Sequence, residues 1–79
     1  MNRINWKDRI VIEPDIHHGS PCIKNTRISV SIIIGSLADG MSPDEIIEEY
    51  PQLTKQDIYA VLSYAAEVLD QENLIPIHS

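Results

Sequence analysis

The apolar residues of the second half of the chain recur at helical spacing, beginning at Val30. Val30, Ile33, Ile34 and Leu37 occupy positions i, i+3, i+4 and i+7, which is the spacing of one face of an α-helix. Gly40 follows the last of them and can adopt the left-handed conformation that ends many helices. The pattern therefore predicts a first helix from Val30 that stops at Gly40.

A second helix is indicated by its start and stop signals. Ser42 is a typical N-cap, Pro43 suits the first helical position, and Glu45 is placed to complete a capping box with Ser42. Pro51 prevents the helix from continuing, because the residue before a proline is forced out of helical geometry. The apolar residues between these signals form its inner face: Ile46, Ile47 and Tyr50.

The third helix is predicted to begin after Thr54, with Asp57 in the reciprocal capping position. Its apolar residues form an unbroken stripe over three turns: Ile58, Val61, Leu62, Ala65, Val68 and Leu69. Three helices of these lengths, the last two joined by about four residues, predict a homeodomain-like helix-turn-helix.

The segment before the first helix has the pattern of short strands and turns. The β-branched run at 9–12 is stopped by Pro14 and predicts a strand. Two apolar segments around Asn25 predict a tight hairpin, in which Asn25 tolerates the left-handed turn conformation. We expect a mostly α-helical single domain with a small N-terminal β-hairpin or sheet (1–29), a three-helix core (30–70) and a C-terminal tail (71–79).

The length and cysteine content restrict how the domain can be stabilised. A chain of 79 residues has a small core, and domains of this size often depend on disulfides, metals or a second subunit. The single cysteine, Cys22, excludes an internal disulfide and is typical of a reducing cytosol. No apolar run approaches the roughly 20 residues of a membrane span. We therefore expect a cytoplasmic homodimer that does not enter a membrane.

The net charge of −6 is unevenly distributed along the chain. Residues 1–27 contain five bases and three acids, whereas residues 28–79 contain Lys55 alone and nine acids. This asymmetry suggests two surfaces with different partners. The simpler interpretation, that the acids keep a small helical domain soluble, stands beside it.

Two separate motifs, at 13–30 and 37–64, resemble the family catalogued as domain of unknown function 433. Asn25 stands where that family commonly has glycine, and Ser29 stands where proline is frequent. The resemblance implies a VapB-type antitoxin of a type II toxin–antitoxin pair, with a helix-turn-helix fold and a PIN-like ribonuclease as its toxin. The matching residues are Gly19, Pro21, Ile23, Thr26, Arg27, Ile28, Val30, Leu37, Gly40, Glu45, Ile46, Tyr50, Pro51, Leu53, Thr54, Asp57, Ile58, Ala60, Tyr64 and Ala65.

Nucleic-acid contacts are expected on the outer face of the third helix and on a basic arm ahead of the helices. In a helix-turn-helix, the start of the last helix enters the major groove, where lysine contacts phosphate or guanine and glutamine reads adenine. The same residue types also occupy ordinary solvated helix faces. The candidate DNA-binding residues are Arg3, Lys7, Arg9, Lys55, Gln56 and Tyr59.

Partner contacts are expected on the acidic second helix and in the tail. A ribonuclease presents positive charge to RNA, so carboxylates such as Glu48 and Glu49 could occupy that surface as a phosphate mimic. The apolar tail residues could dock on a partner as an extended strand, fold back on the chain's own helices, or cover a dimer seam. These residues are Leu74, Ile75 and Ile77.

No catalytic or cofactor motif is recognisable in the sequence. His17, His18 and Cys22 do not supply the four ligands and spacing of a structural zinc site, and Cys22 is expected to be a small buried residue. We therefore expect a non-enzymatic antitoxin without a cofactor or metal, which binds a PIN-like ribonuclease and, as a complex, its own operator. The alternatives are a stand-alone helix-turn-helix regulator and a protein-interaction adaptor that does not bind DNA.

Overall fold

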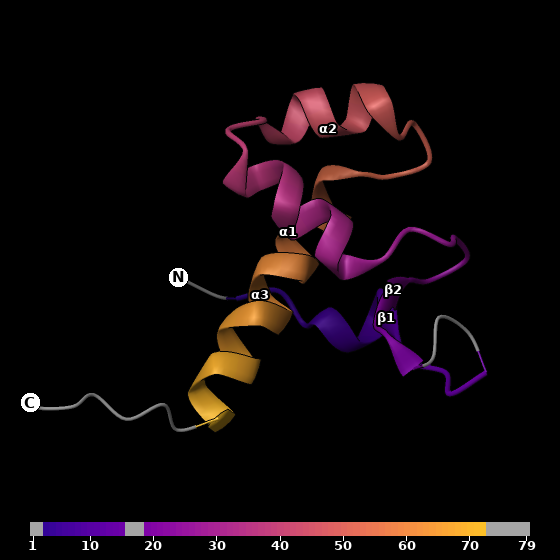
Figure 1. The fold of residues 1–79 in the computed structure, drawn as a ribbon, viewed down its shortest axis with the longest axis vertical. Helices are drawn as coiled ribbons and strands as arrows, with labels where there is room; N and C mark the ends of the chain where they lie inside the picture. The colour runs from indigo at the N-terminus through magenta and orange to yellow at the C-terminus, as the bar shows by residue number, and fades with distance from the viewer. Residues whose placement is uncertain (1–2, 16–18, 73–79) are drawn as a thin grey trace, which may run out of the picture.

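The computed structural model describes residues 3–15 and 19–72 and confirms the expected fold class. Three α-helices make up about half of the described chain, and a two-stranded antiparallel sheet precedes them (Figure 1). The elements are a 3₁₀ helix η1 (Trp6–Asp8), strands β1 (Ile10–Val11) and β2 (Cys22–Ile23), and helices α1 (Val30–Ala38), α2 (Pro43–Glu49) and α3 (Lys55–Glu72).

Helix α1 begins and ends as its sequence signals predict. The Ser29 side chain accepts a hydrogen bond from the backbone N–H of Ile32 at its start. At its end, Gly40 has φ +96°, and the N–H of Met41 donates to the carbonyl of Ser36 at 3.1 Å. This is a Schellman arrangement, which satisfies carbonyls that the helix end would otherwise leave unpaired.

The starts of α2 and α3 both carry the predicted capping boxes. Glu45 N–H donates to Ser42 Oγ at 3.1 Å, and Ser42 N–H donates to Glu45 Oε1 at 2.8 Å. Asp57 N–H donates to Thr54 Oγ1 at 3.2 Å, and Thr54 N–H donates to Asp57 Oδ2 at 2.9 Å. Each box pairs two N–H groups that the first turn cannot satisfy, so the helix starts are fixed by local chemistry.

The N-terminal sheet differs in one respect from the expected arrangement. The predicted turn around Asn25 is present, with Asn25 at φ +66° and Thr26 N–H bonded to the carbonyl of Ile23. However, the segment after the turn forms no third strand in the described chain: Ser29 makes a single bridge to Cys22, because Ser29 is already the N-cap of α1. Strand β2 pairs instead with β1, in the register Ile10↔Ile23 and Val11↔Cys22.

The core lies where the sheet, α1, α2 and the first half of α3 meet. Its most deeply buried side chains, each less than 2% exposed, are Ile23, Ile33, Ile46, Ile58 and Val61. The apolar stripe of α3 divides, because Ile58 and Val61 are fully buried whereas Leu62 is 44% and Leu69 is 55% exposed.

Helix α3 extends through Glu72, two residues beyond the end expected for the helical core. The tail residues expected to contact a partner, Leu74, Ile75 and Ile77, lie outside the described residues. Within the described ranges, no helix is both long and apolar enough to cross a membrane.

Candidate nucleic-acid interface

The segment that carries the basic N-terminal residues is held along one side of α3 (Figure 1). The rings of Trp6 and Tyr64 pack edge to face, with centroids 4.8 Å apart. Trp6 Nε1 donates a hydrogen bond to Glu67 Oε1 at 3.0 Å, and Ser63 Oγ donates to the carbonyl of Ile4 at 2.8 Å. These contacts join residues about 60 positions apart and give the segment a fixed position.

Asp57 ties the same segment to the start of α3. Its carboxylate is 7% exposed, and besides completing the capping box it accepts a hydrogen bond from Arg9 Nη1 at 3.1 Å. A buried carboxylate is stable only when it is paired and hydrogen-bonded, and Arg9 and Thr54 together meet that requirement. The sequence predicted the cap but not the ion pair, because nothing local connects Arg9 to a residue 48 positions later.

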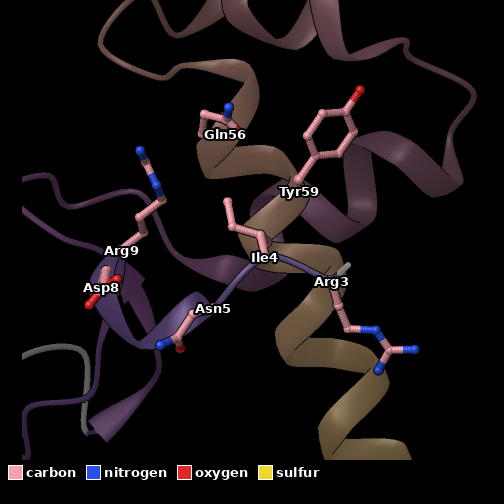
Figure 2. Close-up of a pocket in the computed structure, with 7 residues that line it drawn as sticks. All are labelled: Arg3, Ile4, Asn5, Asp8, Arg9, Gln56 and Tyr59. Carbon is pink, nitrogen blue, oxygen red and sulfur yellow. The ribbon is translucent and has the colours of Figure 1, made fainter. Parts of the chain in front are cut away.

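An open cavity of about 830 Å³ lies between this segment and the first turns of α3 (Figure 2). In Figure 2 the side chains of Arg9, Gln56 and Tyr59 lie on one side of Ile4, while the guanidinium of Arg3 points away from Arg9. Four of the six residues expected to contact DNA therefore line one cavity. Its lining residues are Arg3, Ile4, Asn5, Asp8, Arg9, Gln56 and Tyr59.

The other two expected DNA contacts, Lys7 and Lys55, do not line the cavity. The ammonium of Lys7 lies 5.9 Å from the centre of the Trp6 ring, within the range of a cation–π interaction. Lys55 Nζ lies 3.4 Å from Asp44 Oδ1 in an exposed ion pair. Both lysines are exposed.

The positive charge at this interface is largely offset within the chain. Arg9 is paired with Asp57, Lys55 is paired with Asp44, and Asp8 lines the cavity itself. Phosphate binding depends on the number of cations that displace counterions from the nucleic acid. The candidate interface therefore has polar side chains that could contact bases, but it has little net positive charge to bind the phosphate backbone of a nucleic acid.

The acidic side chains of α2 form a second surface feature. Glu48 and Glu49 are exposed, and with Met41 and Glu45 they line a shallow hollow of about 360 Å³. Glu45 is used by the capping box of α2. Among the described residues, neither Glu48 nor Glu49 forms an ion pair.

Of the residues considered for metal chemistry, only Cys22 lies among the described residues. No group of three or more potential metal ligands occurs among those residues. Cys22 is 2% exposed and its Sγ lies 3.6 Å from the carbonyl oxygen of Ser20, as expected of a small buried residue. His17 and His18 lie outside the described residues.

Comparison with known proteins identifies the family. The family model described as "Protein of unknown function (DUF433)" matches residues 10–65, which is more than half of the chain. The chain belongs to the DUF433 family. The matched region includes both strands, α1, α2 and the first part of α3, so Gln56 and Tyr59 lie within the DUF433 region whereas Arg3, Lys7 and Arg9 precede it.

A solved structure supports the same assignment. The chain is similar to the crystal structure of a DUF433 member protein from Anabaena variabilis ATCC 29413, with a TM-score of 0.75 and 31% sequence identity. The similarity covers 82% of this chain and 64% of the other, so this DUF433 chain spans less than two thirds of that protein's length. No curated protein matches the sequence.

Proposed function

We propose that this DUF433 protein is the antitoxin of a type II toxin–antitoxin pair, that it neutralises a PIN-like ribonuclease, and that the complex binds operator DNA. The proposal starts from the resemblance described above and is carried by one observation. The exposed carboxylates of α2 lie on a different element from the polar and basic side chains that line the cavity beside α3. Two chemically different surfaces suit a protein with two kinds of partner.

The acidic surface suits the ribonuclease. A ribonuclease holds its RNA substrate through cationic side chains, and Glu48 and Glu49 offer exposed carboxylates that no ion pair within the described residues occupies. Both residues lie on α2, a short capped helix, so their backbone positions are already fixed before a partner binds. In this proposal they occupy the cationic surface of the toxin and exclude RNA.

The cavity beside α3 suits weak DNA contact by the isolated chain and stronger contact by a complex. Gln56 can read adenine and Arg3 can contact phosphate, but Arg9 and Lys55 each share their charge with a carboxylate. A toxin that carries additional cations would supply the missing phosphate contacts. We expect the affinity of the complex for operator DNA to fall steeply with added salt.

A stand-alone transcriptional regulator is the second candidate, and the assembly of four expected DNA contacts around one cavity favours it. Such a regulator would bind its operator without a toxin. A protein-interaction adaptor would bind neither operator nor ribonuclease in a salt-dependent way. Binding of the isolated chain and of the complex to the same operator fragment separates these possibilities.

A charge reversal on α2 tests the proposal. Replacing Glu48 and Glu49 by lysine should weaken binding to the PIN-like ribonuclease proposed as the partner by at least about tenfold, because attraction becomes repulsion. The matched control replaces Glu13 and Asp15, two exposed acids of the N-terminal segment, and makes the same change in net charge. Unchanged affinity in the α2 variant, or an equal loss in the control, would refute the role given to this surface.

A further inference from the structure

One side of α3 carries large apolar side chains that the rest of the described chain leaves exposed. Tyr59 is 48%, Leu62 is 44% and Leu69 is 55% exposed, and these are three of the five large exposed apolar residues of the described chain. With Ala66 they occupy positions i, i+3, i+7 and i+10, the spacing of a coiled-coil seam. We call Tyr59, Leu62, Ala66 and Leu69 the α3 seam.

Most of the chain's own packing uses the other sides of α3, although Tyr59 also lines the cavity beside the N-terminal segment and Leu69 lines a hollow that includes Val30 and Ile34. Ile58 and Val61 are fully buried in the core with α1 and α2, while Ser63, Tyr64 and Glu67 contact the N-terminal segment. Two sides of α3 therefore pack against the chain itself, and a third side has exposed apolar residues at heptad spacing. Apolar residues at this spacing are typical of a helix that packs against another helix.

We propose that the α3 seam is a dimer interface, occupied by the α3 seam of a second copy of this chain packed antiparallel across a two-fold axis. In this register Leu62 faces Ala66 of the second copy and Tyr59 faces Leu69 of the second copy. Each large side chain then meets a smaller or more flexible one, which is how knobs fit into holes. The seam is self-complementary, as a two-fold interface requires.

The charges at the ends of the seam select the antiparallel orientation. Lys55 lies one turn before Tyr59 and Asp70 directly follows Leu69, so an antiparallel pair brings the lysine of each copy toward the aspartate of the other. Lys55 also forms an exposed ion pair with Asp44 of its own chain. A parallel pair would place the two lysines together and the two aspartates together. Antiparallel packing also brings opposite ends of the two helix dipoles together.

The exposed area sets the expected strength of the dimer. The three large side chains of the seam still expose roughly 300 Å² of apolar surface per copy, estimated from typical side-chain areas. With the flanking polar residues, a two-fold contact approaches the ~1,000 Å² lower bound of specific interfaces. We therefore expect a concentration-dependent dimer with a dissociation constant of about 1–100 μM.

This dimer does not depend on the proposed antitoxin role. It covers Tyr59, one of the expected DNA contacts, whereas Gln56 of α3 and Arg9 at the end of η1 are not part of the seam. In the dimer, base reading by this helix therefore rests on Gln56 rather than on the tyrosine.

Sedimentation velocity of the full chain alone, over a dilution series that spans the expected dissociation constant, tests the interface. The wild-type protein should pass from monomer to dimer, and Leu62→Glu should weaken the dimer at least about tenfold. Ile12→Glu is the matched control, since Ile12 is 49% exposed but lies outside the seam, and it should leave the dimer unchanged. Circular dichroism should show that both variants remain folded, because both side chains already face solvent.

Disulfide trapping tests the orientation. In a mixture of Leu62→Cys and Ala66→Cys chains, oxidation should join one variant to the other, while either variant alone should cross-link poorly; Cys22 is buried and does not compete. A wild-type chain that stays monomeric at the highest concentration, or an Ile12→Glu variant as weak as Leu62→Glu, would overturn the inference. So would a Leu62→Glu variant that dimerises normally but no longer binds the ribonuclease, because the seam would then belong to the toxin. No toxin is present in the sedimentation experiment, so its failure leaves the proposed function intact.

Discussion

Replacing Asp57 by alanine should destabilise this fold more than any other single loss of charge among the described residues. Asp57 is 7% exposed and performs two tasks: it caps α3 through Thr54 and pairs with Arg9. The first task fixes the start of the longest helix, and the second fastens the N-terminal segment to it. Removal of the carboxylate therefore loosens two parts of the structure at once.

The expected cost follows from the two contacts. Loss of an N-terminal capping interaction costs about 1 kcal/mol. The ion pair contributes less than a buried one would, because the Arg9 side chain is 37% exposed and can be solvated when its partner is removed; we assign it about 0.5–1 kcal/mol. Asp57→Ala should therefore lower the free energy of unfolding by about 1.5–2 kcal/mol, a large share for a domain of this size.

Urea unfolding followed by the fluorescence of Trp6 measures this cost. Trp6 is the single tryptophan, and its ring contacts Tyr64 on α3, so its emission reports the attachment of the N-terminal segment. A double-mutant cycle with Arg9→Ala, Asp57→Ala and the double variant should give a coupling free energy of about 0.5–1 kcal/mol. All variants should be compared at one fixed protein concentration, because the proposed dimer would contribute to stability.

Asp8→Ala is the control, since Asp8 is an exposed acid in the same segment and should change stability by less than about 0.5 kcal/mol. A coupling free energy of zero would show that Arg9 and Asp57 do not interact in solution. An Asp57→Ala variant no less stable than Asp8→Ala would refute the whole argument that this carboxylate organises the start of α3.

Three further changes test other parts of the fold by thermal or urea unfolding. Asn25→Val should lower the free energy of unfolding by about 1–2 kcal/mol because φ at this position is +66°, whereas Asn25→Gly should be nearly neutral. Equal effects of the two substitutions would contradict a left-handed conformation at this position. Trp6→Leu should cost about 2 kcal/mol through loss of the Tyr64 edge contact and the hydrogen bond to Glu67, and a neutral result would mean that the segment is not anchored there. Ser42→Ala should cost about 1 kcal/mol through loss of the α2 capping box, and Ser42→Asp should retain most of the stability if the cap is the cause.

The features of the fold that depend on neighbouring residues could be predicted from the sequence. The capping boxes of α2 and α3, the stop at Gly40 and the left-handed turn at Asn25 each involve a few adjacent residues whose chemistry permits few alternatives. The second strand of the hairpin expected around Asn25 is reduced to one bridge for a comparably local reason, since Ser29 pairs with Cys22 but also serves α1 as its N-cap. A strand and a helix N-cap were both compatible with the sequence at Ser29, and the structure has the N-cap.

The contacts that build the candidate interface could not be predicted in the same way. The Arg9–Asp57 pair and the Trp6–Glu67 hydrogen bond join residues 48 and 61 positions apart. The spacing of residues along α3 does not indicate which distant segment of the chain will pack against the helix. The apolar stripe of α3 likewise indicated which residues share a face but not which of them the small core would cover. Val61 is buried and Leu62 is 44% exposed because α1 and α2 cover only part of the apolar stripe of α3.

Cleavage of RNA by the purified PIN-like ribonuclease proposed as the partner, titrated with the purified chain, tests the proposed function most directly. We expect cleavage to fall to background at equal molar amounts of the two proteins, and the Glu48→Lys, Glu49→Lys variant to require a large excess. Cleavage that continues undiminished at a many-fold excess of the folded wild-type chain would contradict the proposal.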